Sequence, residues 1–144
     1  MEINGIAHVV LTAGDFARSR AFYGELLPFL GLAPVIDAPE FFYCVGGRTA
    51  FGIRPADRAH AGESFSQGRP GLHHVCFRLR SRDEIDALHA FLVARDAAIV
   101  HTPEEAAFAP GYYSVLFEDP DGIRLEANFV PGRGLLVPGA RRGA

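Results

Sequence analysis

The sequence contains no lysine and no tryptophan, and it has only two cysteines and one methionine in 144 residues. Without lysine, the chain has no side-chain amine that could form a Schiff base or titrate as a general base. All 14 basic residues are arginines, and 17 acidic residues bring the formal net charge to -3. Since the charge is slightly negative and no basic stripe is present, we expect no binding to nucleic acid.

Long apolar runs and targeting signals are also missing. No stretch approaches the roughly 18–20 apolar residues that cross a bilayer, so we expect no membrane partner. The first five residues lack the basic and apolar regions of a secretory signal, which predicts a cytoplasmic location. Cys44 and Cys76 lie within apolar runs, which predicts buried thiols in a reducing compartment and no disulfide.

The composition is that of a folded protein. Hydrophobic residues make up 49% of the chain and aromatic residues 11%. Together with the low net charge, these values exclude intrinsic disorder. The length fits one domain or two small halves.

The first half reads as a strand, a helix and three strands. Residues 5–12 form a buried-strand pattern, and Asp15 is a good N-cap for a helix that ends near Pro28. Three short strands are then predicted, with Gly46-Gly47 as the turn between the last two. Their ranges are Leu32–Asp37, Phe41–Val45 and Arg48–Arg54.

The same order begins again after a polar segment. Residues 72–80 predict a strand, and Ser81-Arg82-Asp83-Glu84 is a capping box for a second helix with apolar residues at Ile85, Leu88 and Leu92. Strands are predicted over 98–101, 112–118 and 122–130, with Asp119-Pro120-Asp121-Gly122 as a tight turn. The two helix starts also agree, because Asp15 follows His8 by seven positions and Ser81 follows His74 by seven.

This repeat predicts the architecture. We expect an α+β fold in which two paired βαβββ modules form a curved mixed sheet with a concave metal-binding cleft. The whole chain is then a single domain: the first module spans about 4–54, a linker about 55–71, the second module about 72–130 and an irregular tail 131–144.

Strand alternation selects candidate metal ligands. His8 and His74 occupy equivalent positions and face away from the helices, whereas His73 shares a face with the residues expected to pack under the helix. Glu126, in the last strand, needs a partner because an unpaired buried carboxylate is costly. Two imidazoles and one carboxylate suit Fe(II), Mn(II), Ni(II) or Zn(II) and leave coordination positions open for a substrate. The alternative, that these are ordinary strand residues, stays open.

Aromatic side chains of the strands and loops, with Phe42 in place of Phe41 and Tyr43 if the strand has the other parity, and polar side chains that face the concave side are expected to line a substrate pocket. They suit an aromatic or polyketide-like small molecule better than a phosphorylated sugar, although the aromatic residues would equally fill a core. The predicted lining is Phe41, Tyr43, Phe51, Phe108, Tyr113, Arg78, Arg124 and Asn128.

The repeat, the two strands His-Val-Val-Leu and His-Val-Cys-Phe, and the ending Asp119-Pro120-Asp121-Gly122-Ile123-Arg124-Leu125-Glu126 resemble the vicinal oxygen chelate superfamily. This is the group of glyoxalase I, bleomycin-resistance proteins and extradiol dioxygenases. Residues 19–27 are similar to its first helix, and the resemblance covers about residues 4–130. It implies His8, His74 and Glu126 as ligands of a divalent metal ion, with Fe(II) favoured over Mn, Ni or Zn.

Several features of individual subfamilies are missing. The fourth ligand of glyoxalase-type members, which also moves the proton, matches Gly52 most closely, and the tyrosine of ring-cleaving members matches Leu116. Tyr112 and Ser114 share the strand face of Leu116 and are the candidate catalytic residues. Phosphonate-modifying members use a lysine, which this chain lacks.

The resemblance therefore implies a metal-dependent enzyme that chelates vicinal oxygens of a small, aromatic substrate. We favour an Fe(II) dioxygenase, because two histidines and one carboxylate without a fourth ligand suit Fe(II). A glyoxalase-type lyase or isomerase and a non-catalytic drug-binding protein of the bleomycin-resistance type are the alternatives. A homodimer is expected, and the modules pair either within one chain or across two.

Overall fold

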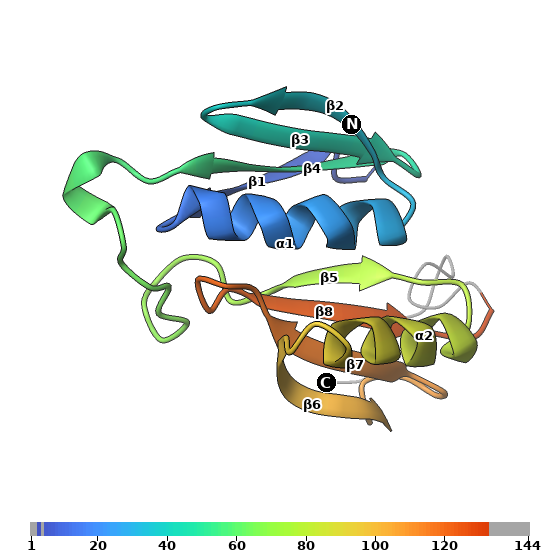
Figure 1. The fold of residues 1–144 in the computed structure, drawn as a ribbon. Helices are drawn as coiled ribbons and strands as arrows, with labels where there is room; N and C mark the ends of the chain where they lie inside the picture. The colour runs from blue at the N-terminus through green and yellow to red at the C-terminus, as the bar shows by residue number, and fades with distance from the viewer. Residues whose placement is uncertain (1–2, 4, 133–144) are drawn as a thin grey trace. The chain divides into compact units, whose positions relative to one another are not determined.

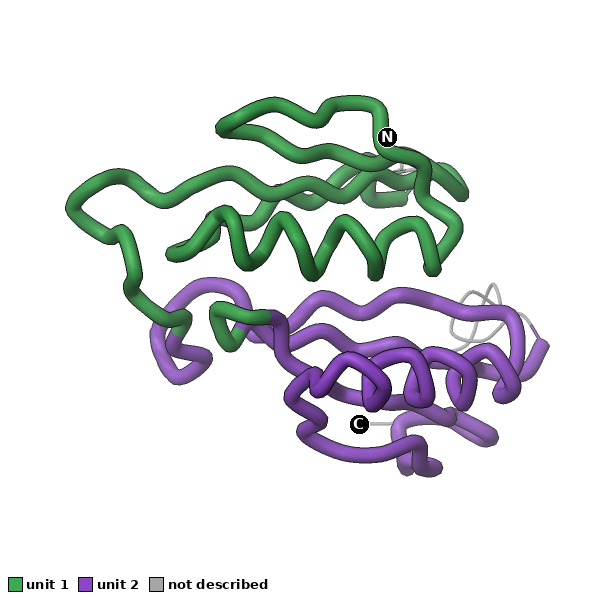
Figure 2. The backbone as a smooth tube through the Cα atoms, in the orientation of Figure 1, with its two compact units in different colours: residues 1–65, 120–122 green, residues 66–119, 123–144 purple. Residues whose placement is uncertain are grey.

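The computed structural model describes residue 3 and residues 5–132. It confirms the α+β class and the two βαβββ modules, and it divides the predicted curved sheet into two four-stranded mixed sheets, each with a helix on one face (Figure 1). The chain forms two compact units (Figure 2). Unit 1 contains residues 1–65 and 120–122, and unit 2 contains the remainder. Residues 133–144 of the predicted tail lie outside the described residues.

Unit 1 holds the first sheet, in the order β1-β4-β3-β2, with β1 parallel to β4. Helix α1 begins where the Asp15 side chain accepts a hydrogen bond from the Arg18 backbone N–H, at 3.0 Å. Its apolar face, including the fully buried Leu26 and Leu27, forms the core of the unit with the inner face of the sheet. The elements are β1 (His8–Ala13), α1 (Phe16–Phe29), β2 (Ala33–Ala38), β3 (Phe41–Gly46), β4 (Thr49–Pro55) and a 3-10 turn (Arg58–His60).

Unit 2 repeats this topology in the order β5-β8-β7-β6, with β5 parallel to β8. Ser81 caps α2 by accepting from the Glu84 backbone N–H at 3.2 Å. The Glu84 carboxylate accepts from the N–H of Arg80 at 2.7 Å, one residue earlier than a capping box predicts. The elements are β5 (Val75–Arg78), α2 (Arg82–Val93), β6 (Ala98–Glu105), β7 (Tyr113–Glu118) and β8 (Arg124–Phe129).

The strand registers show which residues of the two modules occupy equivalent positions. In the second sheet Glu126 lies opposite Cys76 on β5 and Leu116 on β7. In the first sheet Gly52 lies opposite Val10 on β1 and Tyr43 on β3. Since His8 and His74 each stand two residues before the β1 and β5 members of these rows, Gly52 is the counterpart of Glu126.

Within the described residues, no helix is both long and apolar enough to cross a membrane.

The turn at residues 120–122 belongs to unit 1 through a polar contact with α1. Ser19 is fully buried, and its hydroxyl donates to Asp121 Oδ2 at 2.9 Å. Because a hydrogen bond to a charged group contributes about 1.5–3 kcal/mol, we expect Ser19→Ala to lower the free energy of unfolding by about 2 kcal/mol. Urea denaturation measures this, with the exposed Ser66→Ala as a control that stays within about 0.5 kcal/mol of the wild type. Equal stability of both variants would show that the contact contributes nothing.

Candidate functional site

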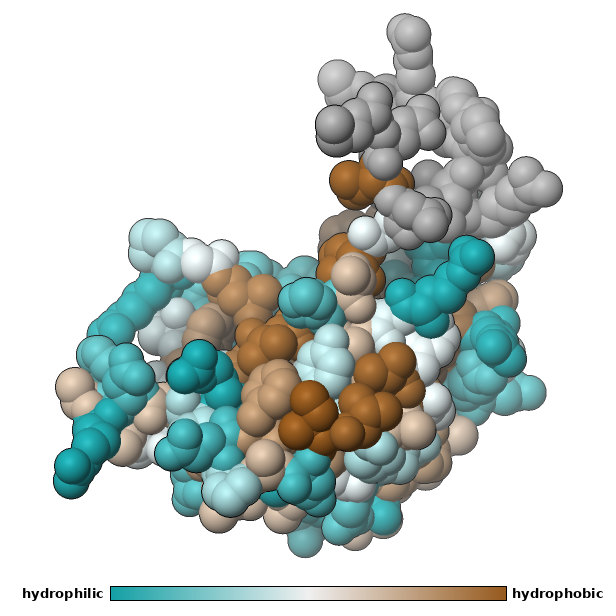
Figure 3. Space-filling view, turned by 90° about the horizontal axis from the view of Figure 1, so that it is seen from above, coloured by the Kyte–Doolittle hydropathy of each residue, from teal (hydrophilic) through white to brown (hydrophobic). Residues whose placement is uncertain are grey.

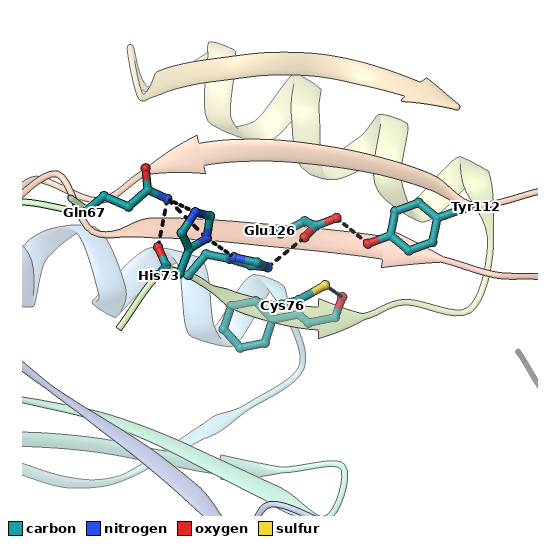
Figure 4. A network of polar contacts seen from close by, with 7 residues as sticks. Gln67, His73, Cys76, Tyr112 and Glu126 are labelled. Atoms are coloured by element: carbon teal, nitrogen blue, oxygen red, sulfur yellow. Dashed lines mark hydrogen bonds and ion pairs between the residues drawn. The ribbon is translucent and has the colours of Figure 1, made fainter. Parts of the chain in front are cut away.

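The candidate site lies on the face of the second sheet that α2 leaves uncovered. Glu126 stands in the middle of this face and is 9% exposed. The Nε2 atom of His74, just before β5, lies 3.2 Å from Glu126 Oε2 (Figure 4). A carboxylate and an imidazole predicted from separate strands are therefore brought into direct contact.

Tyr112 contacts the other oxygen of the same carboxylate. Its hydroxyl donates to Glu126 Oε1 at 2.5 Å, and the residue is 7% exposed. Burial, followed by the hydrogen bond to Glu126, raises the pKa of Tyr112 above its ordinary value. The phenol therefore stays protonated at neutral pH and remains a donor to Glu126.

Cys76 lies opposite Glu126 in the strand pairing and is exposed, whereas Cys44 is buried as predicted. Both thiols are free. Desolvation by neighbouring side chains, and then the charge of Glu126, raise the pKa of Cys76 to about 12. Its thiol is therefore protonated at neutral pH in the metal-free protein, which makes it a poor nucleophile.

His73 is exposed, and the prediction that it packs beneath the helix is wrong. Strand β5 begins only at Val75, so the alternation of faces does not extend back to His73. Its ring instead lies at a steep angle to that of His74, with 2.7 Å between their Nδ1 atoms. Gln67 Nε2 donates to the His73 carbonyl at 3.0 Å and lies 3.2 Å from the ring Nε2 (Figure 4).

In unit 1, His8 lies on the face of the first sheet that α1 leaves uncovered. Its ring meets Tyr43 edge-on, with centroids 6.5 Å apart, and Tyr43 stacks on Phe41 at 5.4 Å. A Cβ atom on Gly52 would come within 2.6 Å of the Tyr43 ring and 2.9 Å of the Phe42 carbonyl oxygen. The counterpart of Glu126 in this sheet therefore has no room for a side chain.

The same face of unit 1 is apolar. Figure 3 shows apolar side chains gathered among polar ones on the side of the first sheet opposite α1. Exposed large hydrophobic residues of its strands are Val10, Val35, Ile36 and Val45. The surroundings of His8 thus differ in chemistry from the polar surroundings of His74.

Two predicted pocket residues lie away from these open faces. Phe51 is 1% exposed and packs against Tyr23 of α1 at 5.5 Å, because its strand position faces the helix. Tyr113 likewise points to the α2 side of its sheet, where its hydroxyl donates to Asp86 at 2.8 Å. Both aromatic rings therefore belong to the helix-covered sides of their sheets.

The remaining predicted residues of unit 2 lie in the same sheet as Glu126 or beside Tyr112. Ser114 and Asn128 are buried and are paired in register, two residues along the strands from the pair of Leu116 and Glu126. Arg78 pairs with Asn128 in register, and Phe108 places an exposed ring 5.3 Å from that of Tyr112. Arg124 Nε makes an ion pair with Glu118 at 3.3 Å.

The His74–Glu126 pair fits part of a metal site. Two ligand atoms that bind one ion at about 2.0–2.2 Å lie roughly 3 Å apart, and the observed separation is 3.2 Å. Within the described part of the chain no cluster of three or more His, Cys, Asp or Glu side chains could hold an ion. His8, the third predicted ligand, belongs to unit 1.

Comparisons with known proteins agree with the architecture. The sequence model of the Glyoxalase/Bleomycin resistance protein/Dioxygenase superfamily matches residues 5–127. The uncharacterized protein YqjT of Bacillus subtilis (strain 168) is 27% identical over 120 residues, which cover 83% of this chain and 94% of YqjT.

Solved structures are similar over most of the chain. A protein from Bacillus halodurans described provisionally as a glyoxalase has a TM-score of 0.78 and 26% identity, with 88% of this chain and 96% of that chain covered. A glyoxylase/bleomycin resistance protein/dioxygenase domain from Frankia sp. EAN1pec has a TM-score of 0.69 and 26% identity, with 89% of this chain and 98% of that chain covered. Lactoylglutathione lyase from Agrobacterium tumefaciens has a TM-score of 0.66 and 22% identity, with 90% of this chain and 96% of that chain covered. This is a likeness of fold alone.

Proposed function

Because the chain belongs to the glyoxalase/bleomycin resistance protein/dioxygenase superfamily, we propose that it is a metal-dependent enzyme with His8, His74 and Glu126 as ligands. The contact between His74 Nε2 and Glu126 Oε2 is the observation that carries this proposal. His8 is included because it is the counterpart of His74 in the repeat. The substrate is a small molecule that offers two adjacent oxygen atoms.

A bound divalent ion supplies Lewis-acid stabilisation of negative charge that develops on the substrate oxygens. The residues of the chain hold and orient the ligands. Tyr112 donates to the Glu126 oxygen that is not in contact with His74, which fixes the orientation of the carboxylate. Because its phenol stays protonated, Tyr112 can hold this position over the whole neutral pH range.

We favour Fe(II) and a dioxygenase reaction on an aromatic substrate. Two histidines and one carboxylate form the ligand set of many non-haem Fe(II) oxygenases. The counterpart of Glu126 is Gly52, which has neither a carboxylate nor space for one, and this argues against a proton transfer of the glyoxalase type. The stacked rings of Phe41 and Tyr43 near His8 suit a planar aromatic molecule.

Elemental analysis of protein purified without added metal tests this function. We expect about one iron per site, and oxygen uptake when an aromatic vicinal diol is added to the reduced protein. Nickel, zinc or manganese without oxygen uptake would favour a lyase or isomerase. A wild-type protein that neither contains nor binds a divalent ion would contradict the enzyme and favour a drug-binding protein with tight stoichiometric capture.

We also propose a homodimer, in which His8 comes either from the same chain as Glu126 or from a second copy. Mixed dimers of His8→Ala and Glu126→Ala chains separate the two cases. If the ligands come from two copies, half of the sites in a mixed dimer recover all three ligands and bind metal. If they come from one chain, no site recovers.

A further inference from the structure

The side of His74 that faces away from Glu126 meets a second imidazole. The Nδ1 atoms of His73 and His74 are 2.7 Å apart, which is a hydrogen-bond distance. Such a bond requires a proton on one nitrogen and a lone pair on the other. The two rings must therefore hold complementary tautomers.

One set of tautomers gives both contacts of the His74 ring a donor and an acceptor. His74 donates from Nε2 to Glu126 and accepts at Nδ1 from His73. The Gln67 amide nitrogen lies 3.2 Å and 3.3 Å from the two nitrogens of the His73 ring. An N–H of the Gln67 amide donates to the His73 carbonyl at 3.0 Å. A directed chain of hydrogen bonds thus runs from His73 through His74 to Glu126, and Gln67 holds His73 by its carbonyl in either tautomer.

We propose that His73 is the positioning residue for His74, held in turn by Gln67; this inference rests on the proposed metal site. A histidine that coordinates through Nε2 carries its ring proton on Nδ1, so the bond to His73 must then run in the opposite direction. A carboxylate or carbonyl partner only accepts, whereas a neutral imidazole has one donor and one acceptor. His73 can therefore orient His74 in both the metal-free and the metal-bound state.

Metal binding to purified variants tests the positioning role. We expect His73→Leu to weaken Zn²⁺ binding in calorimetric titrations by about 10–100-fold, the usual effect of losing a hydrogen-bond partner of a ligand. His73→Asn is expected to recover most of the affinity, because its amide places a donor or an acceptor close to the position of Nδ1. The visible absorption of bound Co²⁺ should change in the Leu variant and return towards that of the wild type in the Asn variant.

Controls separate positioning from folding and from the metal site itself. His60→Leu should bind Zn²⁺ as the wild type does. His60 is an exposed histidine of the 3-10 turn and is paired with Glu63. Thermal unfolding without metal should be alike in all variants. If the wild type binds Zn²⁺ and His73→Leu binds it equally well, or if His73→Asn folds without recovering affinity, the positioning role is wrong and the metal site stands. A wild type that binds no divalent ion overturns both.

Discussion

A Gly52→Glu chain is expected to be strongly destabilised and not to gain a fourth metal ligand. The new Cβ atom would lie 2.6 Å from the Tyr43 ring and 2.9 Å from the Phe42 carbonyl oxygen, which belongs to the backbone and cannot swing away. Overpacking of this kind, with a carboxylate added among aromatic rings, should lower the free energy of unfolding by about 3 kcal/mol or more. Urea denaturation followed by circular dichroism measures the loss.

Two further variants make this result specific. Gly68→Glu, where nothing lies within 4 Å of the new Cβ, should stay within about 0.5 kcal/mol of the wild type. Gly52→Ala tests the Cβ alone and should account for much of the loss. A Gly52→Glu protein of wild-type stability that binds Zn²⁺ more tightly would show that the missing ligand is not a consequence of packing in the first sheet.

The residues paired across the strands at Glu126 and at Gly52 explain why the uncovered faces of the two sheets differ in chemistry. In unit 2 the central residue is Glu126, opposite Cys76 and Leu116, with Tyr112 donating to its carboxylate. In unit 1 the central residue is Gly52, and the ring of Tyr43, the counterpart of Leu116, closes over it. One sheet therefore keeps a carboxylate at this position, and in the other an aromatic ring occupies the equivalent space.

Much of the fold could be predicted from the sequence because it depends on short-range patterns. Capping by Asp15 and Ser81, helical spacing and strand alternation are properties of neighbouring residues, and they placed both helices and eight strands close to their observed positions. The internal repeat added the parallel between His8 and His74. The choice of Glu126 as the partner of a histidine followed from the cost of a lone buried carboxylate.

The parts of the site that could not be predicted depend on where a strand starts and on contacts between distant side chains. Strand alternation predicts a strand from residue 72, although β5 begins at Val75, and it therefore places His73 on the wrong face. Gln67 lies in a polar segment with no periodic signal, yet its amide contacts the His73 ring. Strand alternation singles out Tyr112, but only the structure shows that its hydroxyl contacts Glu126.

Glu126→Gln is expected to reduce the affinity for Zn²⁺ or Co²⁺ by about 1000-fold or more, equivalent to roughly 4 kcal/mol. The substitution removes the negative charge and the anionic oxygen that lies 3.2 Å from His74 Nε2. It keeps the shape of the side chain and an amide oxygen that can still accept from Tyr112. Competition with a chelator of known affinity measures the change, and Glu104→Gln, at an exposed glutamate, serves as the control.

The same variant separates binding from folding. A desolvated carboxylate costs free energy in the metal-free protein, so its neutral replacement should leave the free energy of unfolding without metal within about 1 kcal/mol of the wild type. Loss of affinity with unchanged stability identifies Glu126 as a residue whose charge serves the ion and not the fold. Unchanged affinity would remove it from the ligand set, and a large loss of stability would mean that its contacts with His74 and Tyr112 are structural.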